Sequence, residues 1–181
     1  MYGLVNKAVQ DFVIKGHGEE TWNLIKDKAG VSEAAFVSMQ TYPDKITYDL
    51  VGAASEHFGI DANDILQAFG LHWIKFTMEE GYGHLITLAG GNFPDFLRNL
   101  NNMHTHIAQS YDKLRPPSFL CEDIDESTFR LTYTSEREGL AMFVKGLLLG
   151  LGEKFEVDLD IDYKGQVEGS EQSHEFIVKY S

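Results

Sequence analysis

The first two-thirds of the chain carries apolar residues at the three- and four-residue spacing of amphipathic helices. In the first such segment Val5 and Val9 lie on one face, and Gly16 and Gly18 are expected to end that helix. A break at residues 81–83 is expected to precede a short apolar helix. A second, short helix is expected to carry Trp22 and Ile25 and to end near Gly30, and further helices are expected over about residues 50–58, 61–76 and 92–113.

The pattern changes after Arg115-Pro116-Pro117-Ser118, because the prolines cannot continue a helix. Alternating apolar and polar residues then predict strands at about 129–133, 156–163 and 174–180, with a helix at about 136–151 between the first two. The predicted class is α+β, in a single domain over residues 1–181. A helical part, about 1–60, precedes a helix-containing part with a small antiparallel sheet, about 61–181.

Composition narrows the function classes. The formal net charge is −13, and this acidity makes binding to nucleic acid or anionic lipid unfavourable. Cys121 is the single cysteine, so an internal disulfide and C-x-x-C motifs for zinc, redox work or covalent haem are excluded. No apolar run approaches the about 20 residues of a membrane span, and the start does not have the form of a signal peptide. A cytoplasmic protein is expected, with no membrane insertion.

His104 is the first candidate for chemistry. On the long helix it follows Leu97 and Leu100 at helical spacing, whereas His106 lies about 200° around the helix and faces away. A single imidazole in an apolar stripe is typical of an axial haem ligand. A core or half-exposed histidine without a ligand has the same pattern, and spacing alone favours that alternative.

Tyr133, Ser135 and Arg137 follow the first predicted strand, near the expected start of a helix. A phenol, a hydroxyl and a guanidinium beside a helix N-terminus can bind a carboxylate such as a haem propionate. The alternative is local, because Ser135 and Glu138 have the spacing of a capping box.

The other motifs also have ordinary structural explanations. Pro117 either presses on a flat ligand or only ends the helix, and Phe143 with Leu147 either covers a cofactor or belongs to the core. Nucleotide-binding, serine-hydrolase and zinc-protease motifs are absent from the sequence.

Together, however, the motifs are similar to a known family over essentially the whole chain. The segments that carry the resemblance, in the family's order and spacing, are Met1-Tyr2-Gly3, Asn99-Leu100-Asn101-Asn102-Met103-His104, Arg115-Pro116-Pro117-Ser118-Phe119 and Tyr133-Thr134-Ser135-Glu136-Arg137-Glu138-Gly139-Leu140. The chain resembles the haem nitric oxide/oxygen-binding (H-NOX) domain, in particular its cyanobacterial members and the haem domain of the soluble guanylate cyclase beta subunit.

The resemblance implies a non-covalent haem b buried between the two parts of the chain, with His104 as the iron ligand. It implies that Tyr133, Ser135 and Arg137 hold the propionates and that Pro117 packs on the porphyrin. The further residues that it assigns to the cofactor site are Met103 and, on the distal side of the haem, Val5, Val9, Trp73, Phe143 and Leu147. A distal tyrosine of oxygen-binding members is replaced here by Phe143, which argues against oxygen as the ligand.

The function implied is a gas sensor and not an enzyme. Ferrous haem would bind nitric oxide and carbon monoxide, and loss of the iron–histidine bond would change the conformation presented to a partner. The partners expected are a histidine kinase, a cyclase or a chemotaxis receptor. The alternatives are an iron-free module for an apolar ligand or another protein, an oxygen-binding haem protein, and a haem enzyme such as a peroxidase.

Overall fold

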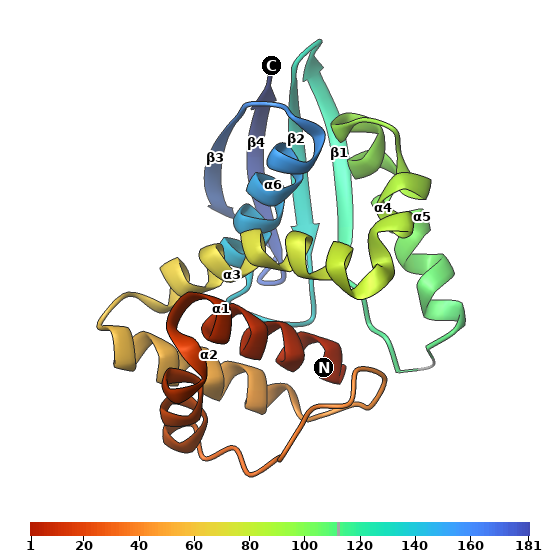
Figure 1. Ribbon diagram of the computed structural model, residues 1–181. Helices are drawn as coiled ribbons and strands as arrows, with labels where there is room; N and C mark the ends of the chain where they lie inside the picture. The colour runs from red at the N-terminus through yellow and green to blue at the C-terminus, as the bar shows by residue number, and fades with distance from the viewer. Residues whose placement is uncertain (112) are drawn as a thin grey trace.

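A computed structural model describes residues 1–111 and 113–181 of the chain. Its first three helices form most of one end of the molecule (Figure 1). They are α1 (Gly3–Lys28), α2 (Asp44–Phe58) and α3 (Ala62–Thr77). The expected break in the first helix is confirmed as a kink at Gly18, where φ is 86°. Asp61 caps α3 as expected, since its side chain accepts a hydrogen bond of 2.8 Å from the Asn63 amide.

Three helical segments link this end to the sheet. They are the π-helical turn η1 (Met78–Tyr82), α4 (Gly83–Ala89) and α5 (Phe93–Gln109). The predicted break lies within η1, at Gly81, where φ is 89°. Asn92 caps α5 by accepting a hydrogen bond of 2.9 Å from the Asp95 amide. The prediction that α5 reaches Lys113 was wrong, because the helix ends four residues earlier.

The sheet is antiparallel throughout and has the strand order β1-β2-β4-β3. Its strands are β1 (Ser118–Asp125), β2 (Thr128–Thr134), β3 (Leu159–Gln166) and β4 (Ser173–Tyr180). β2, β3 and β4 were predicted, although β3 begins three residues later than expected, and β1 was missed. Helix α6 (Ala141–Phe155) lies between β2 and β3 in sequence, and its predicted start at residue 136 was wrong.

Two apolar clusters form the core. One joins α5 and α6 to one face of the sheet, and the other joins α1, α2 and α3. Trp73 on α3 packs against both clusters. Figure 1 shows α6 against the sheet and α5 beside the edge strand β1. Within the described residues, no helix is long and apolar enough to cross a membrane.

Helices α3 and α6 approach each other closely at several glycines, among them Gly70 and Gly146. A Cβ atom on Gly70 would lie 2.9 Å from the Leu147 amide nitrogen and still closer to the Phe143 carbonyl oxygen. A Cβ on Gly146 would overlap the backbone of Gln67 in the same way. The helices therefore meet backbone to backbone, which fixes the separation of the side chains one turn away.

Candidate functional site

His104 lies on the face of α5 that the spacing predicted. Leu97 and Leu100 on that face are buried, His104 is partly buried, and His106 is exposed. The His104 ring faces the ring of Phe119 on β1, with 6.1 Å between the ring centroids. The histidine thus lies where α5 meets the sheet edge.

The environment of His104 favours a neutral imidazole. Burial lowers the pKa of His104, and the backbone carbonyl of Pro117 opposes this shift without reversing it. The interaction with this carbonyl does not have the geometry of a hydrogen bond to Nδ1, which is buried and has no partner. A buried ring nitrogen without a partner is costly, so this position suits an imidazole that binds a ligand through the ring.

Helix α5 is attached to the edge strand β1 by side chains one turn apart. The amide of Asn101 donates to the Phe119 carbonyl at 2.6 Å and accepts from the Phe119 amide at 2.8 Å. Three residues earlier, Arg98 forms an ion pair of 2.6 Å with Asp123. This set of contacts, which we call the α5–β1 seam, holds the helix of His104 in register with the sheet.

Tyr133 and Ser135 lie at the end of β2, close to His104. Tyr133 is buried, and its ring centroid lies 5.5 Å from that of Phe119, so the three rings form one row. Ser135 is also buried, and its hydroxyl accepts a hydrogen bond of 3.0 Å from the Arg137 amide. Since α6 begins only at Ala141, the capping-box explanation of Ser135 is wrong.

Arg137 connects the sheet part to the first helices. Its Nε donates to Asp44 at 2.8 Å, and its Nη1 donates to the Arg115 carbonyl at 2.9 Å. The Met1 ammonium also pairs with Asp44. Burial raises the pKa of Asp44, but the Met1 ammonium and the Arg137 guanidinium outweigh it, so the net pKa lies below its ordinary value.

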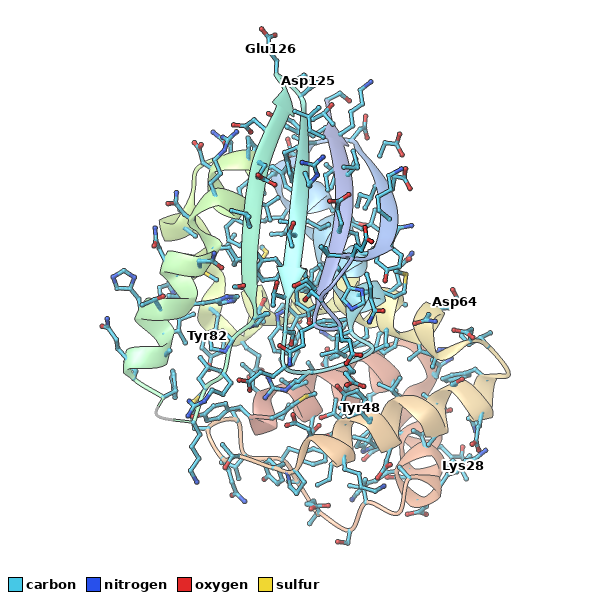
Figure 2. The ribbon with its side chains drawn as sticks, turned by 180° about the vertical axis from the view of Figure 1, so that it is seen from behind. Lys28, Tyr48, Asp64, Tyr82, Asp125 and Glu126 are labelled. Carbon is cyan, nitrogen blue, oxygen red and sulfur yellow. The ribbon has the colours of Figure 1, made fainter. Side chains whose placement is uncertain are left out.

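A second contact crosses the same junction. The hydroxyl of Tyr48 on α2 donates to the Glu138 carbonyl at 2.9 Å. Figure 2 shows Tyr48 at the boundary between the helical end and the sheet. The loop after β2 is therefore held by α2 on one side and by its own strand on the other.

Most of the predicted distal residues come together. Val5, Val9 and Phe143 belong to the cluster of the first helices, and Phe143 and Trp73 are 6.3 Å apart between ring centroids. Leu147 packs instead with the sheet cluster. The remaining predicted residue, Met103, packs with the sheet cluster too, and Trp73 joins the two groups.

Sequence reasoning did not find several contacts between segments distant in the chain. Asn101 and Asp44 were not singled out, because a polar residue on a helix gives no sign of a partner far away in the chain. His72 shares a hydrogen bond of 2.8 Å with Asp11, which ties α3 to α1. Only its position beside Trp73 could have indicated that it is enclosed.

The residues present fit a haem. The unpartnered Nδ1 of His104 marks an imidazole suited to metal ligation, and the ring of Phe119, which belongs to the sheet cluster, packs against it. Tyr133, Ser135 and Arg137 offer two hydroxyls and a guanidinium for carboxylates. The Phe119 ring on β1 lies between the two groups, 6.1 Å from the His104 ring on α5 and 5.5 Å from the Tyr133 ring on β2.

Residues 2–163 of the chain match the family model described as Haem-NO-binding. Among curated proteins, the chain is 31% identical over 161 residues to the Soluble guanylate cyclase gcy-33 of Caenorhabditis elegans, covering 89% of this chain and 17% of that protein. It is 28% identical over 155 residues to the Soluble guanylate cyclase 89Db of Drosophila melanogaster, covering 86% of this chain and 23% of the relative. The chain thus spans less than a quarter of the length of these relatives.

Solved structures share the fold over the full length. An H-NOX protein from S. oneidensis in the Fe(II)NO ligation state matches with a TM-score of 0.88 and 18% identity, covering 100% of this chain and 99% of the other. The Fe(II) unliganded H-NOX protein from K. algicida matches with a TM-score of 0.84 and 20% identity, covering 100% and 97%. The α+β class predicted from the sequence is confirmed.

Proposed function

Because the chain belongs to the Haem-NO-binding (H-NOX) family, and is therefore a haem-based gas-sensor domain, we propose that nitric oxide is its signal and His104 the protein ligand of its iron. The assignment of His104 rests on its Nδ1 atom, which is buried and has no hydrogen-bond partner. The Phe119 ring lies between the His104 and Tyr133 rings. We propose haem b, held without a covalent bond. Haem held by His104 would supply a ferrous iron able to bind a diatomic gas.

In this proposal Tyr133, Ser135 and Arg137 bind the propionates. Two of them are buried at the end of β2, and Arg137 reaches the same place from the following loop. Arg137 already carries the Asp44 ion pair, so a propionate would join a charged network that also reaches α2. Pro117, whose backbone carbonyl interacts with His104, would pack on the porphyrin, and Met103, which packs with the sheet cluster, would also line the site.

The distal side consists of Val5, Val9, Trp73, Phe143 and Leu147. Four of these have no side-chain hydrogen-bond donor, and Trp73 packs between aromatic rings as a wall. Stable binding of oxygen benefits from a distal donor, whereas nitric oxide and carbon monoxide need one much less. We therefore propose that the protein binds the latter two gases and forms no stable oxygen complex.

In this proposal His104 would link the cofactor to α5, which lies along the sheet edge. A change in how His104 is held would let α5 shift along that edge, within the limits of the α5–β1 seam. Since Arg137 and Tyr48 join the sheet part to α2, a shift there would move the first helices as well. We propose that a cytoplasmic partner detects this shift, and a cyclase is the first candidate because the relatives are guanylate cyclases.

The His104 assignment is tested by His104→Gly. We expect the variant to lose the five-coordinate ferrous spectrum and added imidazole to restore it. His106→Ala is the matched control, since it removes an exposed imidazole two residues away on the same helix. An unchanged iron–histidine Raman stretch in His104→Gly would contradict the assignment.

The choice of gas is tested with ferrous protein in air-saturated buffer. We expect no persistent oxygen complex in the wild type, and Phe143→Tyr to begin to stabilise one. A well-placed donor is worth about 1–3 kcal/mol, or roughly five- to 150-fold in affinity. A stable oxygen complex of the wild type that disappears in Trp73→Phe would show that Trp73 is a donor and refute the apolar distal side.

A further inference from the structure

The three residues at the start of the propionate-binding segment each have a partner near the start of β4. Tyr133 is paired with His174 and Thr134 with Ser173 in the sheet register. The Ser135 amide donates to the Gln172 carbonyl at 3.0 Å. The segment 172–174 therefore borders the segment 133–135 along its whole length.

On one face of the sheet, Ser173 links these two segments through its side chain. It is 9% exposed, and its hydroxyl lies 2.8 Å from the Thr134 hydroxyl and 3.0 Å from that of Ser170. Ser170 belongs to the turn between β3 and β4, which closes when the Val167 amide donates to the Ser173 carbonyl at 2.9 Å. A buried hydroxyl without partners is costly, so this chain of hydroxyls fixes the turn against β2.

On the other face of the sheet, His174 packs beside Tyr133. Its ring lies 6.2 Å from the Tyr133 ring, on the side away from Phe119. The His174 ring is held in turn by a hydrogen bond of 2.8 Å between its Nδ1 and the Tyr163 hydroxyl. Tyr133 thus has a ring on each side, and its phenol can point in few directions.

We propose that Ser173 and His174 are positioning residues for the haem propionates, acting through Tyr133 and Ser135. This inference rests on the proposed function, because it assigns a role toward the same cofactor. The two residues set the direction of the phenol and the place of the serine before the cofactor binds. The family motifs described above do not include Ser173 or His174, which lie about 40 positions after Tyr133.

The isosteric pair Ser173→Val and Ser173→Thr tests the hydroxyl. Both variants are β-branched and suit a strand, and only Thr keeps the hydrogen bond. In the haem-loaded protein we expect Ser173→Val to transfer haem to an apo-myoglobin trap about two- to tenfold faster, as for the loss of one hydrogen bond. We also expect its propionate bending mode in the resonance Raman spectrum to shift, and Ser173→Thr to restore both values.

The control is Ser127→Val, which changes a serine beside Asp125 and Glu126 at the opposite end of the sheet (Figure 2). It should leave both readings unchanged. If Ser173→Val does not fold, the pair His174→Leu and His174→Phe takes its place. Phe retains the ring beside Tyr133 and should behave as the wild type, whereas Leu should release haem faster.

Two results would overturn the assignment. One is a folded Ser173→Val protein with wild-type haem transfer and propionate mode. The other is an equal defect in Ser173→Val and Ser173→Thr, which would indicate crowding and not the hydroxyl. Wild-type protein that takes up no haem would overturn the proposed function itself, and is distinguished at once by the missing Soret band.

Discussion

Replacing Gly70 by alanine should destabilise the protein, although the same change in an open helix does the opposite. In a helix interior, alanine is favoured over glycine by about 1 kcal/mol. At Gly70, however, the new Cβ would lie 2.9 Å from the Leu147 nitrogen and closer to the Phe143 carbonyl. These are backbone atoms of α6, which cannot rotate away.

The magnitude follows from these two opposing effects. Overpacking of a tight interior costs about 1–3 kcal/mol, and contact with backbone places this site at the upper end. After the gain in helix propensity, Gly70→Ala should lower the free energy of unfolding by about 1–2 kcal/mol. Gly52 in α2 has no heavy atom within 4 Å of an added Cβ, so Gly52→Ala should raise it by about 0.5–1 kcal/mol.

Urea unfolding of the two variants and the wild type, at equal haem saturation, provides the assay. The midpoint should fall for Gly70→Ala and rise for Gly52→Ala, with an unchanged denaturant slope in both. A Gly70→Ala midpoint at or above that of the wild type would refute the reasoning. It would mean that α3 and α6 can separate freely, and that Trp73 and Phe143 are not held at a fixed spacing.

Other contacts give predictions of the same kind. Asn101→Leu should lower stability by about 1–2 kcal/mol through loss of two hydrogen bonds to β1, whereas Asn102→Leu should have little effect; equal urea midpoints would contradict this. Burial raises the pKa of Cys121 to about 11, so iodoacetamide at pH 8 should label it roughly a hundredfold more slowly than a free cysteine, and rapid labelling of folded protein would disprove the burial. The pKa of Asp44 is lowered in the folded state, so its stabilising effect is present at neutral pH and is lost as the pH falls through that lowered value. Asp44→Asn should therefore be less stable than the wild type at pH 7, and thermal unfolding should show this difference shrinking below about pH 4; a constant difference would exclude the ionic explanation. Arg137→Ala should lose haem roughly ten- to a hundredfold faster, as measured with an apo-globin trap, and an unchanged rate would remove it from the propionate site.

Periodicity was enough to find most of the helices and the face of His104. Leu97 and Leu100 repeat at helical spacing, so the buried stripe could be predicted. β1 was missed because its apolar residues do not alternate cleanly. Phe119 faces the core, but Leu120 and Ile124 are 58% and 50% exposed on the other face.

The limits of the site were harder to predict because they depend on contacts distant in sequence. The start of α6 is delayed by the loop in which Ser135 bonds to the Arg137 amide and Gly139 has a φ of 73°. The spacing of a capping box was present, but the chain used the hydroxyl for a tight turn. Likewise, the partnership of Asn101 with Phe119 depends on how a helix lies against a strand that sequence analysis did not find.

The α5–β1 seam also affects how the protein behaves among copies of itself. β1 is an edge strand, and an uncovered edge offers backbone amides and carbonyls to any other extended chain. Asn101 occupies both backbone groups of Phe119, and α5 lies along the same border. The opposite edge, β3, carries outward-facing charges at Asp160, Asp162 and Lys164 and an irregular register before Gly165. Both borders of the sheet are thus protected against strand addition, so the residues that hold the histidine helix in place also oppose aggregation.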